Sequence, residues 1–446
     1  MPSRHLLPAA LAATLLAACS TGTGSGVATS GAPTPAGSGT ASASPTPTVE
    51  APLPTEPLAR ARTLLAQYDY AGASAAIEKV TTPDADDLRA RIAAAQASAK
   101  PWPHMDAVPH VFFHTLVVDP KRAFTKDAEG VGYSQYMVTV SEFRKQLQQM
   151  YDRGYVLVHP QRIAAKDAQG VMRYQQLLLP PGKKPLVLSL DDLSYYEYMT
   201  GKGFASRLVV DERGHVVTEY TRPDGTAVRG DDDCVPIVDD FVRTHPDFAY
   251  HGDKGSVAMT GYNGVLGYRT SVHSYGDTPT TRAEQAKAKV VADAMKEQGW
   301  HFASHSWGHI NFTRSSLGRI TRDSTRWDAE VKPILGATNE LIFPFGADIS
   351  GMTPYSDANA KFRYLHGTEG FDYIFPIDAS KPAWQQLTKD ALRQARVNVD
   401  GISMQQNLDG RSKTLDTFFD TRSTLDPLRP LPVPMVGGPV PGGAGH

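Results

Sequence analysis

The chain has 446 residues, 41% of them hydrophobic, and its 45 Lys and Arg nearly balance its 47 Asp and Glu. This length and composition can bury a sizeable core, enough for one large domain with attachments. No long block of basic residues occurs, so we expect no nucleic-acid partner.

The first residues predict export. Arg4 and His5 precede the run "LLPAALAATLLAAC", which is too short to span a bilayer and has the apolar centre and small-residue end of a signal peptide. The end of this run, Leu16 to Cys19, resembles the lipobox of bacterial lipoproteins. The alternative is an ordinary cleaved signal with a chance cysteine. We predict a signal peptide over residues 1–18 and a lipid on Cys19 that anchors the protein to the outer face of the bacterial cell membrane.

Three further segments differ in composition from a folded domain. Residues 19–57 consist mainly of Ser, Thr, Gly, Ala and Pro and are expected to form a disordered tether, and the Pro/Gly-rich residues 426–446 a disordered tail. Residues 58–100 are Ala-rich, with apolar residues at helical spacing, and this pattern predicts two or three small helices.

Cys234, in "DDDCVP", is the only cysteine besides Cys19, and its acidic neighbours disfavour a nucleophilic thiolate.

Residues 105–425 alternate apolar strands with helices. Strands are predicted at 110–118, 155–159, 184–190, 255–261, 300–305, 339–346, 362–367 and 373–378, and helices at 141–154, 235–246, 281–298 and 324–335. This order favours an α/β fold with a parallel sheet covered on both sides, and the number of units suits a (β/α) barrel. A β-hairpin turning at Glu212 to Gly214 is expected to be an insertion.

Two adjacent carboxylates follow the strand "LVLSL". Asp191 and Asp192 lie where a parallel strand ends, the edge at which such sheets gather reactive groups. A cation shared by the pair would relieve the repulsion between them. The alternative for the isolated pair is a helix cap.

Histidines supply possible metal ligands. "HFASHSWGH" contains His301, His305 and His309 at intervals of four, and "HVFFH" contains His110 and His114. Imidazoles at this spacing can converge on one zinc ion, although spacing alone does not say which two would do so.

The order of these motifs resembles that of the polysaccharide deacetylase family, carbohydrate esterase family four. "SLDDL" stands where the family has Thr-Phe-Asp-Asp-Gly, "HSWGH" is similar to its His-Ser/Thr-x-x-His, and "FPFG" (residues 343–346) to its Pro-aromatic-Gly core. The resemblance covers about residues 108–378 and implies a distorted (β/α) barrel of the polysaccharide deacetylase type.

The resemblance also implies roles for individual residues. Asp191 would be the general base, and Asp192, His305 and His309 would hold a divalent metal, most simply Zn²⁺, that polarises the carbonyl and acidifies the attacking water. Pro344 and Phe345 would contact substrate, and aromatic side chains near the site could accept a glycan.

The sequence departs from the family at three places. Leu193 replaces the glycine after the aspartates, Leu341 stands where an arginine orients the base, and no Leu-x-His supplies the acid of the last motif. Arg269, in "TGYNGVLGYRT", is our hypothesis for the orienting cation, with a surface residue as the alternative. His114 is our hypothesis for the acid, and a structural histidine is the alternative.

The leading prediction is therefore a membrane-tethered, extracytoplasmic hydrolase that removes N-acetyl groups from a cell-wall or exported polysaccharide. An O-acetyl esterase would tolerate the missing acid because an ester has a better leaving group. A non-catalytic glycan-binding lipoprotein is the third possibility.

Overall fold

The computed structural model describes residues 53–434. The predicted signal peptide, Cys19, most of the predicted tether, and residues 435–446 lie outside the described residues. Among the residues that are described, none of the helices combines the length and apolar character that a membrane span requires.

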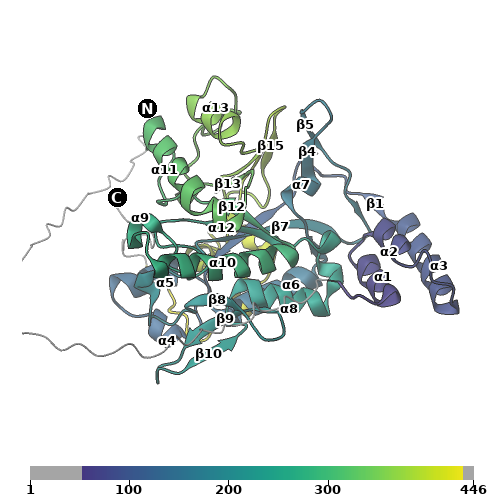
Figure 1. The fold of residues 1–446 in the computed structure, drawn as a ribbon, viewed down its shortest axis with the longest axis horizontal. Helices are drawn as coiled ribbons and strands as arrows, with labels where there is room; N and C mark the ends of the chain where they lie inside the picture. The colour runs from purple at the N-terminus through teal and green to yellow at the C-terminus, as the bar shows by residue number, and fades with distance from the viewer. Residues whose placement is uncertain (1–52, 435–446) are drawn as a thin grey trace, which may run out of the picture. The chain divides into compact units, whose positions relative to one another are not determined.

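The helical segment contains three helices, as the Ala-rich pattern predicted: α1 (Pro57–Ala66), α2 (Tyr70–Ala76) and α3 (Pro83–Ser98) (Figure 1). Each begins after a side chain that accepts a hydrogen bond from a first-turn N–H, and these capping residues are Glu56, Asp69 and Thr82. The segment contacts the larger domain through Tyr68, whose hydroxyl donates to the carbonyl of Asp247 at 2.7 Å.

A curled sheet forms the centre of the larger domain. In spatial order its strands are β15 (Gln385–Leu387), β16 (Leu392–Gln394), β14 (Tyr373–Phe375), β13 (Glu340–Ile342), β12 (Trp300–Ser304), β11 (Gly255–Met259), β7 (Lys184–Asp191), β2 (His110–His114) and β17 (Val397–Asn398). The first half of β7 also pairs with β3 (Tyr155–Leu157). All of these pairs are parallel except β15 with β16.

One extended segment links the two ends of this sheet. β16 pairs with β14, Arg396 bridges Ile377, and the next residue begins β17, which pairs with β2. The segment 392–398 therefore lies between β14 at its start and β2 at its end. This curled, mostly parallel α/β sheet is consistent with the predicted distorted barrel.

Helices alternate with the strands and cover the sheet (Figure 1). The longer ones are α5 (Ala128–Tyr136), α6 (Val140–Asp152), α8 (Cys234–Thr244), α10 (Pro279–Glu297), α11 (Leu317–Glu330), α13 (Ala360–Gly367) and α14 (Gly401–Leu408). Single turns are α4 (Pro120–Ala123), α7 (Pro160–Ile163), α9 (Val272–Tyr275), α12 (Lys332–Leu335) and α15 (Thr421–Thr424). The sequence encodes the ends of α6 directly, because Thr139 and Glu142 form a capping box and Gly154 follows with φ 83°.

One sequence prediction about an element was wrong, and the prediction of the hairpin was confirmed but incomplete. "FRYLHG" belongs to helix α13, because the Asn359 side chain caps its first turn and Phe362 and Leu365 bury one helical face. The insertion has a third strand besides the predicted hairpin: its antiparallel sheet consists of β8 (Arg207–Val210), β9 (Val216–Thr221) and β10 (Ala227–Gly230).

Short strand pairs complete the fold. β1 (Lys100–Pro101) pairs with β6 (Leu178–Leu179), and β4 (Ala164–Lys166) pairs with β5 (Met172–Tyr174). These pairs lie in the connections before β7 and contribute no residue to the pocket described below.

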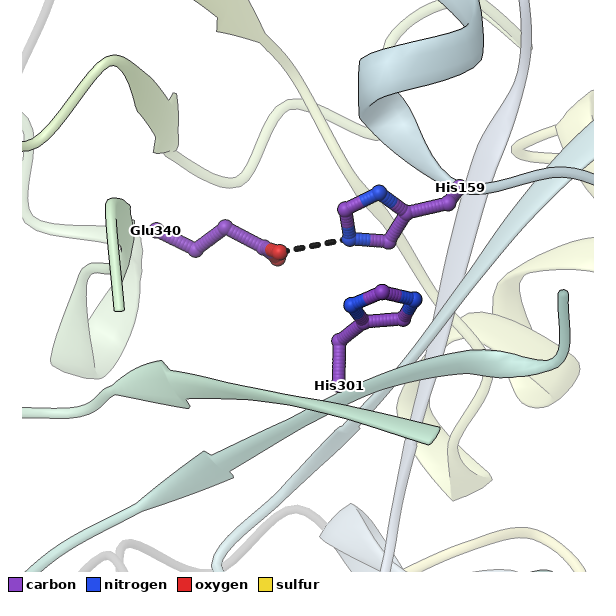
Figure 2. Close-up of side chains that lie close together, drawn as sticks. All are labelled: His159, His301 and Glu340. Carbon is purple, nitrogen blue, oxygen red and sulfur yellow. Dashed lines mark hydrogen bonds and ion pairs between the residues drawn. The ribbon is translucent and has the colours of Figure 1, made fainter. Parts of the chain in front are cut away.

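A polar cluster lies at the amino end of the parallel strands. Figure 2 shows its three side chains. His159 directly precedes α7, His301 is the second residue of β12, and Glu340 is the first residue of β13. Nε2 of His159 and Oε1 of Glu340 are 2.6 Å apart, and both side chains are 3% exposed.

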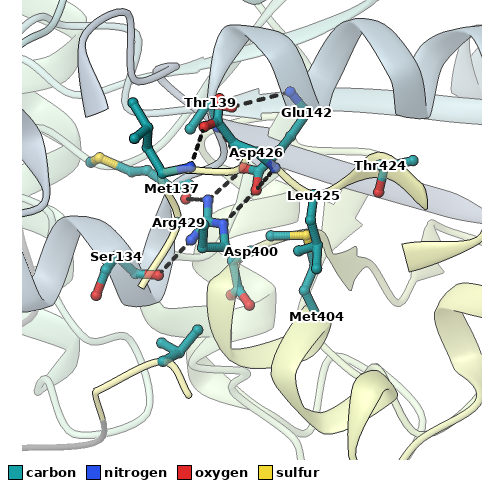
Figure 3. A network of polar contacts seen from close by, with 12 residues as sticks. Ser134, Met137, Thr139, Glu142, Asp400, Met404, Thr424, Leu425, Asp426 and Arg429 are labelled. Atoms are coloured by element: carbon teal, nitrogen blue, oxygen red, sulfur yellow. Dashed lines mark hydrogen bonds and ion pairs between the residues drawn. The ribbon is translucent and has the colours of Figure 1, made fainter. Parts of the chain in front are cut away.

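A second buried network holds the end of the described chain (Figure 3). Arg429 donates two hydrogen bonds to the Glu142 carboxylate, at 2.5 and 2.6 Å, and both side chains are fully buried. The same guanidinium donates to the carbonyls of Ser134 and Met137 at the end of α5. We expected disorder from residue 426 onward, but residues up to 434 are packed in part, because Arg429 supplies the cation that pairs with the buried Glu142 carboxylate.

We predict that Arg429→Met destabilises the protein by about 3–5 kcal/mol, because it leaves the Glu142 charge buried without its partner. The free energy of unfolding in urea measures the loss. Arg411→Met is the matched control, since Arg411 and Asp409 form an exposed pair, and it should change the free energy by about 1 kcal/mol or less. Equal losses in the two variants would contradict the assigned role of Arg429.

Candidate metal-dependent active site

The predicted site residues converge at the carboxyl ends of neighbouring strands. His114 and Asp191 end β2 and β7 and are paired in register, and His305 follows the last residue of β12. Together with His309 they line a pocket of about 280 Å³. Its other lining residues are mostly aromatic or apolar: Phe112, Tyr136, Met137, Tyr196, Tyr198, Met199, Phe345 and Ile377, with Asp192, Asn398 and Asp400.

Asp191 is held as a buried anion by Arg396. Nη1 of Arg396 donates to Oδ1 of Asp191 at 2.6 Å, and the arginine side chain is 0% exposed. Burial raises the pKa of Asp191, but the charges of Arg396 and His305 outweigh this effect and hold that pKa at about 2. Asp191 is therefore ionised at neutral pH.

Asp192, His305 and His309 form a compact group of metal-ligand type. Their ligand atoms all lie within 4.8 Å of one another, and all three residues are buried. Nε2 of His309 lies 3.5 Å from Oδ2 of Asp192. Two imidazoles and one carboxylate are a donor set that zinc accepts in catalytic sites.

The surroundings orient these ligands toward a common point. Nδ1 of His305 donates to the carbonyl of Ile342 at 2.8 Å, which leaves Nε2 as the acceptor nitrogen. The Tyr196 hydroxyl donates to Oδ1 of Asp192 at 2.5 Å and leaves Oδ2 on the side of His309. Burial lowers the pKa of His305 to about 4, so this imidazole is neutral at pH 7, as metal ligation requires. The residues therefore fit a bound divalent metal.

Left-handed backbone is concentrated at this site. Of the eight non-glycine residues with positive φ in the described chain, four belong to this site, a backbone region that such residues rarely adopt: Asp192, Ser306, His309 and Phe345, with φ between 50° and 59°.

The histidine loop, residues 305–309, is held in this conformation by hydrogen bonds to helix α11. The Asp323 carboxylate on α11 accepts hydrogen bonds from the backbone N–H groups of Trp307 and Gly308 at 2.7 and 2.8 Å. Because these contacts hold two of the three residues between His305 and His309, α11 determines where the second histidine lies.

Two further predicted residues are found at the pocket. His114 lines it, and its buried Nδ1 has no hydrogen-bond partner among the described residues. Phe345 is 41% exposed and places its edge against His309, with 4.4 Å between ring centroids. Pro344 is buried and starts the turn that carries Phe345, but does not itself line the pocket.

The prediction for Arg269 was wrong. Its guanidinium donates to the carbonyls of Tyr195 and Asn263, at 2.8 and 3.1 Å, and does not contact Asp191. Arg396 makes that contact instead, from the segment between β16 and β17. The signal for this contact in the sequence is a cation within the strand-like "ARVNVDG", residues 395–401.

Comparison with known proteins adds little to this geometry. No family model matches the chain, and no curated protein matches it. Among solved structures, it is similar to a Streptococcus pyogenes deacetylase, PplD, in complex with acetate, with 15% identity and a TM-score of 0.37 over 72% of this chain and 100% of that chain.

We predict that Arg396→Met destabilises the metal-free protein by about 3–5 kcal/mol at pH 7, because Asp191 is left as an unpaired buried charge. The pKa of Asp191 in the fold, about 2, lies below that of an unfolded Asp, about 3.9. The contribution of the pair is therefore fully present above about pH 4 and is lost as the pH falls through about 2.

Urea unfolding at pH 7 and pH 3 tests this expectation. The difference between wild type and Arg396→Met should narrow at pH 3, and adding Asp191→Asn should recover part of the loss at pH 7. A difference that does not change with pH would show that Arg396 stabilises the fold by packing alone.

Proposed function

We propose that this protein is a metal-dependent hydrolase that removes acetyl groups from a cell-envelope polysaccharide. The observation that carries the proposal is the adjacency of two buried carboxylates with different partners. Asp191 is paired with Arg396, and Asp192 faces His305 and His309. One acid is thereby kept available as a base, while the other belongs to a metal-ligand group.

Asp192, His305 and His309 would hold the metal. A divalent cation bound by these residues supplies a Lewis acid that polarises the acetyl carbonyl and lowers the pKa of the attacking water. Asp191 accepts the proton from that water as it attacks the carbonyl carbon. Because Arg396 keeps Asp191 ionised, the base is in its active form at neutral pH.

The leaving group needs a proton when the substrate is an amide. His114 lies at the end of β2 beside Asp191, lines the pocket, and carries a buried Nδ1 with no hydrogen-bond partner in the described chain. In its protonated form it can donate to the departing amine as the carbon–nitrogen bond breaks. It would thus replace the histidine of the last family motif.

The shape and lining of the pocket support an acetylated sugar as the substrate class. Phe112, Tyr136 and Tyr198 provide faces on which an apolar sugar ring or acetyl methyl packs, and Asn398 and Asp400 provide polar groups that can contact hydroxyls. Our proposal places the protein outside the cytoplasm, attached through a lipid on Cys19. The motif at residues 16–19 supports this placement.

The first test of this function separates the base from the ligand. Asp191→Asn should retain wild-type metal content and lose about 100- to 10,000-fold in acetate release from N-acetylated glycans. Asp192→Asn should lose both activity and one metal ion per chain. Acetate assays combined with elemental analysis provide both readouts, and His104→Gln, at an exposed histidine, is the control. An Asp192→Asn variant with unchanged metal content would refute the proposed site.

The second test concerns the proton donor. His114→Gln should slow hydrolysis of an N-acetyl sugar by about 100-fold or more, and hydrolysis of an aryl acetate far less, because an aryloxide leaves without a proton. Measuring kcat for both substrates gives the comparison. A loss equal for both would remove His114 as the acid, and wild-type activity on aryl acetates alone would identify an O-acetyl esterase.

A further inference from the structure

The amino end of the curled sheet carries a second group of metal-ligand side chains. We propose that His159, His301 and Glu340 form a binding site for a divalent transition metal, separate from the candidate active site. Their ligand atoms lie within 4.8 Å of one another. His301 is the first of the three evenly spaced histidines in "HFASHSWGH", and the proposed function gives His301 no role.

The geometry brings three distant parts of the chain to one point. Figure 2 shows the imidazoles of His159 and His301 one above the other, each with a ring nitrogen on the side that faces the Glu340 carboxylate. The ring centroids are 3.6 Å apart with 23° between the planes, and Nε2 of His159 lies 2.6 Å from Oε1 of Glu340. Ligand atoms around a tetrahedral zinc are separated by roughly 3.3 Å, so modest side-chain rotations complete the site.

The surroundings match those of a ligated carboxylate. Oε2 of Glu340 accepts a hydrogen bond from the Ser256 hydroxyl at 2.6 Å, which orients the carboxylate and leaves Oε1 toward the imidazoles. Arg162, a cation close enough to act on His301, is already paired with Asp253 at 3.0 Å. One carboxylate and two imidazoles would therefore bind a divalent cation without opposition from an unpaired arginine.

Binding changes one contact of His159. The backbone N–H of Gln161 donates to Nδ1 at 3.4 Å, which is long for a hydrogen bond. Ligation through Nε2 moves the ring proton to Nδ1, so this contact is lost. A proton between His159 and Glu340 is the competing occupant of the same space, and metal binding must displace it.

The site is distinct from the candidate active site. His301 and His305 are four residues apart on or directly after β12, a separation of about 13 Å along an extended strand. The metal at the amino end would join the residue before α7 to β12 and β13. Its effect would be to stabilise the fold, with no direct part in acetyl hydrolysis.

The test uses the full chain with the active-site ligands removed, Asp192→Asn with His305→Gln, so that its result does not depend on the proposed function. Equilibrium dialysis against Zn²⁺, followed by elemental analysis, should find one zinc per chain. Adding Glu340→Gln should reduce this to none, and Zn²⁺ should then cease to raise the melting temperature. The matched control is Glu369→Gln, a partly buried glutamate far from the cluster in sequence, which should retain one zinc.

A third variant guards against misfolding of Glu340→Gln. His301→Gln leaves the ion pair of His159 and Glu340 intact and should also lose the zinc, together with the visible absorption of bound Co²⁺. Absence of zinc from the starting protein, or retention of one zinc in either variant of the cluster, would overturn the proposal. In that case the group is a hydrogen-bonded ion pair only.

Discussion

The contact on which the candidate site depends most is the buried ion pair between Asp191 and Arg396. Two neighbouring carboxylates with no cation beside them would be protonated in so apolar a place. Arg396 prevents this for Asp191, and its guanidinium also lies over the Phe112 ring, 4.1 Å from the centroid. The segment that supplies Arg396 also connects the two ends of the curled sheet, so closure of the fold and ionisation of the base depend on the same residues.

The ligand side of the site depends on a different constraint. His309 and Asp192 have left-handed backbone, and such conformations persist only where the surrounding structure imposes them. Asp323 imposes this on the histidine loop, and Tyr196 fixes the Asp192 side chain. Both supporting residues are buried in the core, which favours a ligand geometry that forms before any ion arrives.

Sequence reasoning predicted the parts of this arrangement that are local in the chain. The four residues lie at or shortly after the ends of two apolar strands, and parallel strands bring their carboxyl ends to one edge; they are Asp191, Asp192, His305 and His309. The role of Arg396 was not predicted, because the strands on either side of it do not have an apolar pattern. β16 is three residues long, β17 is two, and both contain polar side chains. Such a segment becomes a strand only when β14 and β2 are in place on either side.

The group of His159, His301 and Glu340 could not be predicted from the sequence for a related reason. His159 and Glu340 are 181 positions apart, and nothing near either residue marks it as a ligand. Only the sheet order brings them together. The helix in place of the expected strand at 362–367 has a local cause. Six residues with apolar side chains at 362, 364 and 365 are too few to separate a helical from a strand period, and the cap at Asn359 decides between them.

The docking of the small helical segment has a consequence for access to the pocket. Its contacts reach Asp247 and His251, just before β11 begins, which is the amino end of the parallel strands. The pocket opens at the carboxyl end of those strands. The helical segment therefore docks on the side of the domain opposite the reactive groups and contributes no residue to the pocket lining, so attachment of the chain through residues before α1 would leave the pocket accessible.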